Sequence, residues 1–294
     1  MRVHLLDGTY ELFRHFYAMP RQQDRTGHEV AAIIGVLGSA LGMLEGGSTH
    51  LGVATDHVIE SFRNELWAGY KTSAGIEPDL MAQFHPLEDA LRAMGVVVWA
   101  MEEFEADDAL AAAARVAADS KAVEQVIICT PDKDLSQCVQ GRRVVQLDRR
   151  KRELRDETGV VARFGVGPAS IPDYLALVGD SADGFPGLPG WGEKASGAVL
   201  CRYAHLEKIP ASHTQWEVAV RGAARLAATL EEHRELAILF RRLATLRTDV
   251  PVGTVDDLQW RGPTPEFESV AQQLGVPGLW DRAKRAITSL NPTG

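Results

Sequence analysis

Residues 96–134 read VVVWAMEEFEADDALAAAARVAADSKAVEQVIICTPDKD, and this stretch decides the fold. An apolar run (96–100) precedes an alanine-rich segment (107–119), and a second apolar run follows at 125–130. Alanine is the strongest helix former, and short runs rich in valine and isoleucine favour strands. The stretch therefore predicts a strand, a helix and a second strand, which is the repeating unit of a parallel sheet.

The same alternation continues on both sides of this unit. Further strands are predicted at 3–6, 50–55 and 143–147, and further helices from residue 10, at 29–45 and at 78–94. From about residue 156 the chain reads as helices joined by glycine- and proline-rich turns. We therefore predict an α/β body over 1–155, with a mainly parallel central sheet flanked by helices, and a helical subdomain over 156–294.

The bulk properties are those of an ordinary globular protein. The chain has 294 residues, of which 45% are hydrophobic and 24% are charged. No apolar run approaches the roughly 20 residues that span a bilayer, and the first residues lack a secretion signal. The three cysteines show no metal-binding or paired spacing. We expect a cytoplasmic protein that does not bind membranes and is a monomer.

Acidic residues follow four of the predicted strands. The carboxyl ends of parallel strands meet at one edge of a sheet, so these side chains are expected to converge there. The helical half adds two more aspartates in GDSAD (179–183). The complete set is Asp7, Asp56, Glu105, Asp107, Asp108, Asp132, Asp134, Asp180 and Asp183.

Carboxylates this close raise one another's pKa unless a cation lies between them. Oxygen ligands without histidine or cysteine suit Mg²⁺ or Mn²⁺ and argue against zinc. Two ions about 4 Å apart are the arrangement that supports in-line displacement at phosphorus. Any one of these motifs alone is more typical of a capped helix start, and only their coincidence at four strand ends predicts a metal site.

The net charge of −9 does not exclude a nucleic-acid partner. Removing the nine clustered acids from the 40 Asp and Glu leaves 31, which equals the 31 Lys and Arg. The rest of the protein is therefore neutral on this count, and bound cations offset part of the remainder.

The motifs, in their order along the chain, resemble the 5′ nuclease domain of bacterial DNA polymerase I and the flap endonucleases. The resemblance runs over about residues 1–250. It rests on LLDGTYELFRHFYA (5–18), ATDHVIESFRNELWAGYK (54–71), FEADDALA (104–111), TPDKDLSQ (130–137) and YLALVGDSADGFPGLPGWGEKAS (174–196).

This resemblance implies two metal ions, DNA as the partner, and a role for each motif. The first ion is implied at Asp7, Asp56, Glu105, Asp107 and Asp108, and the second at Asp132, Asp134, Asp180 and Asp183. The cations implied to meet phosphate are Arg14, Arg63, Lys71 and Lys133. A helix–three-turn–helix near 179–203, sometimes with K⁺, is implied to grip duplex phosphates through Gly187, Gly190, Gly192 and Lys194.

Three features depart from the family pattern. Ala74 stands where an arginine is common, and the family's SDN is replaced by Ala182, Asp183 and Gly184. The stretch 72–90, which corresponds to a cation-rich arch, has no Lys or Arg. It carries the acids Glu77, Asp79, Glu88 and Asp89. We expect such an arch to repel single strands, so that nicked or recessed 5′ ends are better substrates than long flaps.

The sequence thus predicts a stand-alone, metal-dependent 5′–3′ exonuclease or 5′ flap endonuclease that hydrolyses DNA phosphodiester bonds. Three alternatives stay open. One is a PIN-like ribonuclease, which shares the α/β body. Another is a phosphatase-like hydrolase that uses Asp132 and Asp134 as a nucleophile pair. The third is a catalytically weak protein that binds DNA junctions.

Overall fold

The computed structural model describes residues 1–290, and the chain forms two compact units. The first unit comprises Met1–Ile59, Ser73–Thr130 and Thr248–Gly294, and the second comprises Glu60–Thr72 and Pro131–Arg247. The predicted boundary at residue 155 stays a prediction. The contacts divide the chain at other positions, because residues after 247 pack again with the first unit.

Four parallel strands form the centre of the first unit, in the order β3-β2-β1-β4. Their bounds are β1 (Arg2–Asp7), β2 (His50–Asp56), β3 (Val97–Met101) and β4 (Gln125–Cys129). Every residue of β2 is buried, as expected for a parallel strand covered on both faces. The prediction of a mainly parallel sheet is confirmed.

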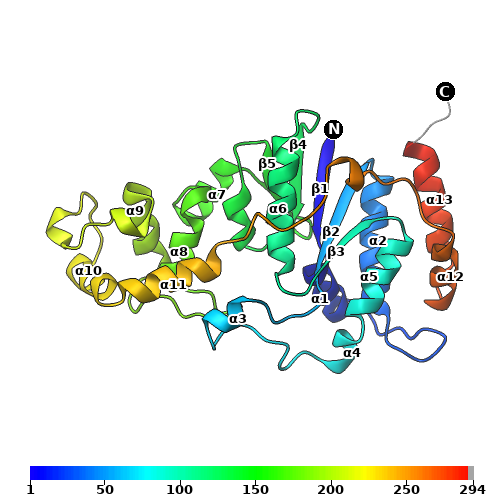
Figure 1. Ribbon diagram of the computed structural model, residues 1–294, viewed down its shortest axis with the longest axis horizontal. Coiled ribbons are helices and arrows are strands. Elements are labelled where there is room, and N and C mark those ends of the chain that lie inside the picture. The colour runs from blue at the N-terminus through cyan, green and yellow to red at the C-terminus, as the bar shows by residue number, and fades with distance from the viewer. Residues whose placement is uncertain (291–294) are drawn as a thin grey trace. The chain divides into compact units, whose positions relative to one another are not determined.

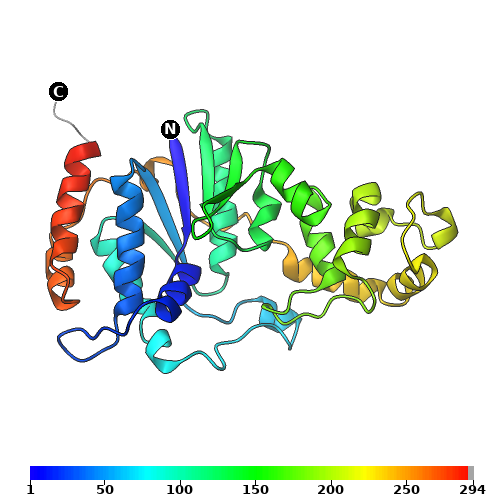
Figure 2. The ribbon, with the colours of Figure 1, turned by 180° about the vertical axis from the view of Figure 1, so that it is seen from behind.

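Helices cover both faces of this sheet (Figures 1 and 2). The chain moves from β1 to β2 to β3 in one direction and then returns past β1 to β4. Right-handed crossovers therefore place α6 on the face opposite to α1, α2 and α5. The bounds are α1 (Gly8–Ala18), α2 (Ala31–Glu45), α4 (Pro78–Met81), α5 (Phe84–Ala93), α6 (Ala106–Asp119), α12 (Glu266–Gln273) and α13 (Gly278–Leu290).

The predicted helix over 78–94 is interrupted between α4 and α5. The buried side chain of Gln83 lies at the interruption and accepts the N–H groups of Ala32 and Ile33, at 3.2 and 3.3 Å. These are N–H groups of the first turn of α2, which has no side-chain cap from its own N-cap residue. The break in the helix thus satisfies backbone donors of another helix, a contact that local sequence does not encode.

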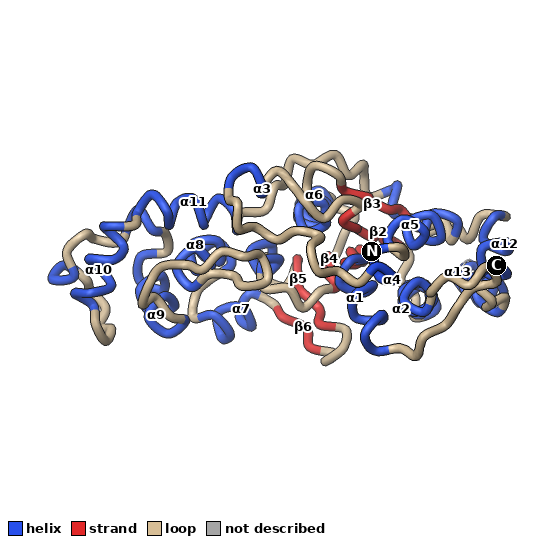
Figure 3. The backbone as a smooth tube through the Cα atoms, turned by 90° about the horizontal axis from the view of Figure 1, so that it is seen from below, coloured by secondary structure: helices blue, strands red, loops and turns tan. Residues whose placement is uncertain are grey.

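The second unit is mostly helical, as predicted. An antiparallel pair of strands, β5 and β6, precedes all helices of this unit except α3 (Arg63–Leu66), and β6 has only three residues within a basic segment in which we predicted no strand. Helices α8 and α11 lie side by side in this unit (Figure 3). The bounds are α3 (Arg63–Leu66), β5 (Val144–Asp148), β6 (Glu153–Arg155), α7 (Glu157–Phe164), α8 (Ile171–Val178), α9 (Glu193–Tyr203), α10 (Ala223–Glu232) and α11 (Arg234–Ala244).

The second unit has an apolar core of its own. Phe185 and Phe240 are almost completely buried there, with ring centroids 5.5 Å apart. Phe185 lies in the segment that joins α8 to α9, so packing fixes this connection as firmly as it fixes the helices. No helix within residues 1–290 is long and apolar enough to cross a bilayer.

Gly52 offers a test of how the first unit is packed. A Cβ at Gly52 would lie 2.4 Å from the ring of Trp99, whose Nε1 donates to the carbonyl of Val252 at 3.1 Å. We expect Gly52→Ala to lower the free energy of unfolding by about 1–3 kcal/mol in urea titrations. Gly42→Ala is the control, since it lies in a helix with nothing within 4 Å and should stabilise by about 1 kcal/mol. Equal effects of the two substitutions would contradict this account.

Candidate active site

Two predicted ligands end neighbouring strands of the first unit. Asp7 ends β1 and caps α1: its Oδ1 accepts the N–H of Tyr10 at 2.8 Å, and its Oδ2 accepts the Thr130 hydroxyl at 2.9 Å. Asp56 ends β2, and its Oδ1 accepts the N–H of Ala106 at 2.8 Å. Both carboxylates are buried at the carboxyl edge of the sheet. Each carboxylate is held in one orientation by a backbone N–H at the start of a helix, α1 for Asp7 and α6 for Asp56.

The acids of FEADDALA lie at the start of α6. Glu105 is the N-cap residue, and it forms a capping box in which the Oδ2 of Asp108 accepts the Glu105 N–H at 3.0 Å. Asp108 is completely buried, whereas Asp107 is only half-buried. Capping is a sufficient structural reason for Glu105 and Asp108, and it coexists with a metal role because a carboxylate can accept several bonds.

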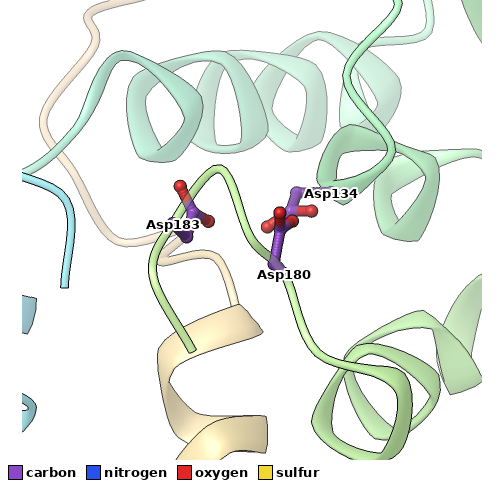
Figure 4. Close-up of side chains that lie close together, drawn as sticks. All are labelled: Asp134, Asp180 and Asp183. Carbon is purple, nitrogen blue, oxygen red and sulfur yellow. The ribbon is translucent and has the colours of Figure 1, made fainter. Parts of the chain in front are cut away.

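Three predicted ligands come together in the second unit. One carboxylate oxygen each from Asp134, Asp180 and Asp183 lies within 4.8 Å of the others (Figure 4). Asp134 begins a short 3₁₀ helix, and the other two lie in the segment after α8. Asp132 lies beside them and accepts the N–H of Asp134 at 2.9 Å. The 4.8 Å spacing is one that a single cation can bridge.

Asp134 is the member of this cluster that most requires a cation. Its side chain is buried, and its Oδ1 has no hydrogen-bond partner within the described chain. Burial raises the pKa of Asp134 well above the usual value, and the charges of the neighbouring aspartates raise it further. An oxygen-only donor set with one unpartnered buried oxygen fits a hard divalent cation.

Two of the predicted cations lie directly on this cluster. The Nζ of Lys133 lies 2.8 Å from Asp180 Oδ2, and that of Lys71 lies 3.3 Å from Asp183 Oδ1. Burial lowers the pKa of Lys133, but the hydrogen bond to Asp180 and the negative charges of Asp180, Asp134 and Asp132 together raise the pKa overall. Both side chains remain about a third exposed, so their ammonium groups can also reach an incoming anion.

The two predicted arginines are placed differently. Arg14 contacts Glu11 on its own helix and donates to the Ser39 hydroxyl at 3.3 Å. Arg63 is 1% exposed and donates to the carbonyl oxygens of Leu243 and Thr245. These carbonyls close the C-terminal end of α11, so Arg63 anchors that helix. A contact between Arg63 and phosphate stays a prediction. The burial of Arg63 and its bonds to α11 do not favour that contact.

The glycines of the segment between α8 and α9 fall into two groups. Gly187 is buried with φ +70°, and a Cβ there would lie 2.4 Å from the Gly179 nitrogen, so this glycine is needed to form the turn. Gly190 and Gly192 are exposed, with no other atom closer than 3.9 Å to an added Cβ. Gly192 is the N-cap of α9, where no side chain caps the helix, and Lys194 is exposed in the first turn. The open backbone N–H groups at this helix start suit an anion.

The acids of the stretch 72–90 do not form one repulsive surface. Glu77 and Asp79 form ion pairs with Arg21, at 3.1 and 3.3 Å. Asp89 pairs with Arg92 on its own helix. Glu88 is 1% exposed and belongs to the interior of the first unit. Arg21 and Arg92 pair with three of the four acids and the interior of the first unit holds the fourth. The predicted preference for nicked or recessed 5′ ends over long flaps stays a prediction.

Sequence reasoning missed two hydroxyl residues that hold the strand-end acids. Thr130 donates to Asp7, and Thr9 accepts the N–H of Asp56 at 2.8 Å. Both threonines occur inside the quoted motifs, beside the acids. Threonine is common near strand ends, however, and carries no signal of its own until the register is known.

The chain belongs to the 5′–3′ exonuclease family. Its residues 2–165 match the N-terminal resolvase-like domain of 5′–3′ exonucleases, and residues 166–266 match their C-terminal SAM fold. DNA polymerase I of Pseudomonas aeruginosa is 38% identical over 276 residues, 90% of this chain and 29% of that protein. A 5′–3′ exonuclease of Aquifex aeolicus is 31% identical over 275 residues, 92% of this chain and 90% of that protein. The chain therefore spans about a third of the length of the polymerase relatives and most of the exonuclease.

Solved structures share the fold. The bacteriophage T5 D15 protein, crystallised with metal ions, has a TM-score of 0.65 at 14% identity, and each chain covers 99% of the other. The catalytic core of Rad2 in complex with DNA substrate has a TM-score of 0.63 at 15% identity, over 98% of this chain and 92% of that one. At these identities the likeness concerns the fold alone.

The raised pKa of Asp134 predicts how cation binding and stability depend on pH. The folded protein without metal binds this proton more tightly than the unfolded chain does, so its stability falls as pH rises from the ordinary carboxyl pKa through the raised one. Deprotonated Asp134 is the form that binds a cation, so added Mn²⁺ should raise the melting temperature more at pH 8 than at pH 5.5. Differential scanning fluorimetry measures this effect. Asp134→Asn should reduce the pH dependence of stability without metal and also that of the stabilisation by Mn²⁺. If the melting temperature of this variant depended on pH as that of the wild type does, the role given to Asp134 would be wrong.

Proposed function

We propose that this protein is a metal-dependent 5′ nuclease that hydrolyses DNA phosphodiester bonds at or near a 5′ end. The observation that carries the proposal is the Asp134–Asp180–Asp183 cluster, in which a buried oxygen of Asp134 has no hydrogen-bond partner within the described chain, in a member of the 5′–3′ exonuclease family. The relatives named as exonucleases, and the DNA complexes of Rad2, support DNA as the substrate class. Monomeric state and cytoplasmic location remain predictions.

The cation sites follow from the chemistry of the donors. Asp134, Asp180 and Asp183 would hold one divalent ion, with Asp132 beside it. Asp7, Asp56, Glu105, Asp107 and Asp108 would hold the other, directly or through water. When bound, Mg²⁺ or Mn²⁺ supplies positive charge to the phosphoryl oxygens and makes a coordinated water more acidic.

The protein's own residues orient and neutralise the substrate. Lys71 and Lys133 offset carboxylate charge in the structure as it stands. A cation on the same carboxylates would weaken these ion pairs, leaving the two ammonium groups to contact the scissile phosphate and stabilise the charge that develops there. Arg14 is a candidate for a neighbouring phosphate, since its side chain is a quarter exposed.

Duplex DNA would be held away from the chemistry, at the start of α9. Gly190, Gly192 and Lys194 present backbone N–H groups and one ammonium group at a helix N-terminus, where the dipole favours a phosphate. The proposed helix–three-turn–helix near 179–203 comprises the connection after α8 and the whole of α9, and K⁺ is proposed there on the family resemblance alone. These contacts read the backbone and not the bases, so binding would be independent of sequence.

The first functional test concerns the metals. Cleavage of a 5′-labelled flap, a nicked duplex and a single strand should require Mg²⁺ or Mn²⁺ and stop with excess EDTA. Asp107→Asn should slow single-turnover cleavage by about a hundredfold or more, on the order of 3 kcal/mol in the barrier. Asp119→Asn is the matched control on the same helix, where it is exposed, and should change little. Cleavage in EDTA would refute the mechanism. Intact DNA binding with no cleavage by the wild type under any metal would favour the catalytically weak junction binder.

The second functional test separates binding from chemistry. Gly192→Leu introduces a side chain into open space at ordinary backbone angles, so the fold should persist while phosphate approach is blocked. We expect duplex affinity to fall about tenfold, as measured by fluorescence anisotropy at several salt concentrations. Gly167→Leu is the control, since it also faces open space in the same unit. Asp7→Asn should retain duplex binding and lose cleavage. If it lost both equally, the separation of duplex binding at α9 from cleavage at the acidic residues would be wrong.

A further inference from the structure

The carboxylate of Glu88 joins the two residues that flank Asp56. Glu88 lies on α5, and its Oε1 accepts the hydroxyl of Thr55 at 2.8 Å. Its Oε2 lies 2.8 Å from the Nδ1 of His57. One buried side chain thus bonds to the residue before Asp56 and to the residue after it.

A carboxylate in this position is costly and needs a reason. Glu88 is 1% exposed, and burying a charge without a strong partner is unfavourable. The Nη2 of Arg92 lies 3.8 Å from the Glu88 Oε2, and Arg92 is itself 46% exposed, so this ion pair offsets little of the cost. The bonds to Thr55 and His57 are therefore the principal compensation, and they concern the end of β2.

The end of β2 is held from both faces of the sheet. Side chains alternate along a strand, so Thr55 and Asp56 point to opposite faces. On one face Asp56 accepts the N–H of Ala106, at the start of α6. On the other face Glu88 of α5 bonds to Thr55. The carboxylate of Asp56 is consequently fixed by its own bond and by the two residues beside it.

His57 has a second support. Its ring stacks on that of His85, with centroids 3.9 Å apart and an interplanar angle of 9°. The Nε2 of His85 also lies 3.1 Å from the carbonyl oxygen of His57. The backbone just beyond Asp56 is therefore held by α5 at two points, which restricts how far the Asp56 carboxylate can turn.

We propose that Glu88 is a positioning residue for Asp56, which sets the geometry of the cation site in the first unit without touching the cation. The inference rests on the proposed function, in which Asp56 is a metal ligand. Residues that orient a ligand typically change metal affinity by 10- to 100-fold when removed. Glu88 thus belongs to the metal centre, although its place in the sequence assigned it to the arch.

The experiment measures Mn²⁺ binding to the full-length protein, by electron paramagnetic resonance of the free ion. Asp56→Asn first defines which binding step depends on Asp56. Glu88→Ala is expected to weaken that same step about tenfold. Glu88→Gln is expected to bind nearly as the wild type does, because an amide can accept from Thr55 and donate to the other tautomer of His57. Asp89→Ala is the matched control, adjacent on α5 but exposed, and should change nothing.

Activity provides a second measurement with the same variants. Single-turnover cleavage by Glu88→Ala should need about tenfold more Mn²⁺ for half-maximal rate, while the rate at saturating Mn²⁺ and the affinity for DNA stay close to wild type. If Glu88→Ala fails to fold, as judged by circular dichroism, Thr55→Val removes one of the two contacts and should weaken Mn²⁺ binding several-fold.

The outcomes distinguish the metal-binding role of Asp56 from the positioning role of Glu88. If Asp56→Asn leaves Mn²⁺ binding unchanged, the metal assignment within the proposed function fails. If Asp56→Asn weakens binding but folded Glu88→Ala and Thr55→Val do not, the positioning role of Glu88 is overturned. An equal loss in Glu88→Ala and Glu88→Gln would also overturn it, because rescue by the amide would then be absent.

Discussion

The pairing of β1 between β2 and β4 is the constraint on which the first unit depends. Parallel pairing aligns the carboxyl ends of these strands, so Asp7 and Asp56 emerge at one edge with no freedom to separate. The helices that follow present free backbone N–H groups at the same edge, and Tyr10 and Ala106 donate theirs to the two acids. Strand pairing therefore brings Asp7 and Asp56 to one edge of the sheet. The helices that begin at that edge supply the N–H groups that hold the two carboxylates.

The two units tolerate crowded carboxylates by different means. In the first unit, Asp7 accepts from the N–H of Tyr10 and the hydroxyl of Thr130, and Asp56 accepts from the N–H of Ala106. These neutral donors fix the orientation of the carboxylates and leave their charge in place. In the second unit, Lys71 and Lys133 pair with the cluster, and Asp134 retains a proton more readily than an ordinary aspartate does. In both units a divalent cation would add positive charge to the same carboxylates.

Residues of one type take opposite roles according to where the fold places them. Gly187 is buried and required by its turn, whereas Gly192 is exposed, with nothing within 4 Å of an added Cβ. Glu77 is a surface acid paired with Arg21, whereas Glu88 is an interior acid bonded to both sides of a strand end. Sequence position alone grouped each pair together, because the glycines share one motif and the acids share one stretch.

The sequence by itself determined the α/β class, the helical second half and the positions of acids at strand ends. These follow from local periodicity and from motif order, and a strand-end acid must lie at the strand's end in any register. The tertiary structure decided what depends on contacts distant in sequence. The predicted helix over 78–94 is interrupted, and Gln83 at the interruption caps α2. Arg63 is buried against the C-terminal end of α11, and the last helices pack with the first unit. Hydrogen bonds between residues 31 to 182 positions apart fix Glu88 and Arg63, and no local pattern specifies such partners.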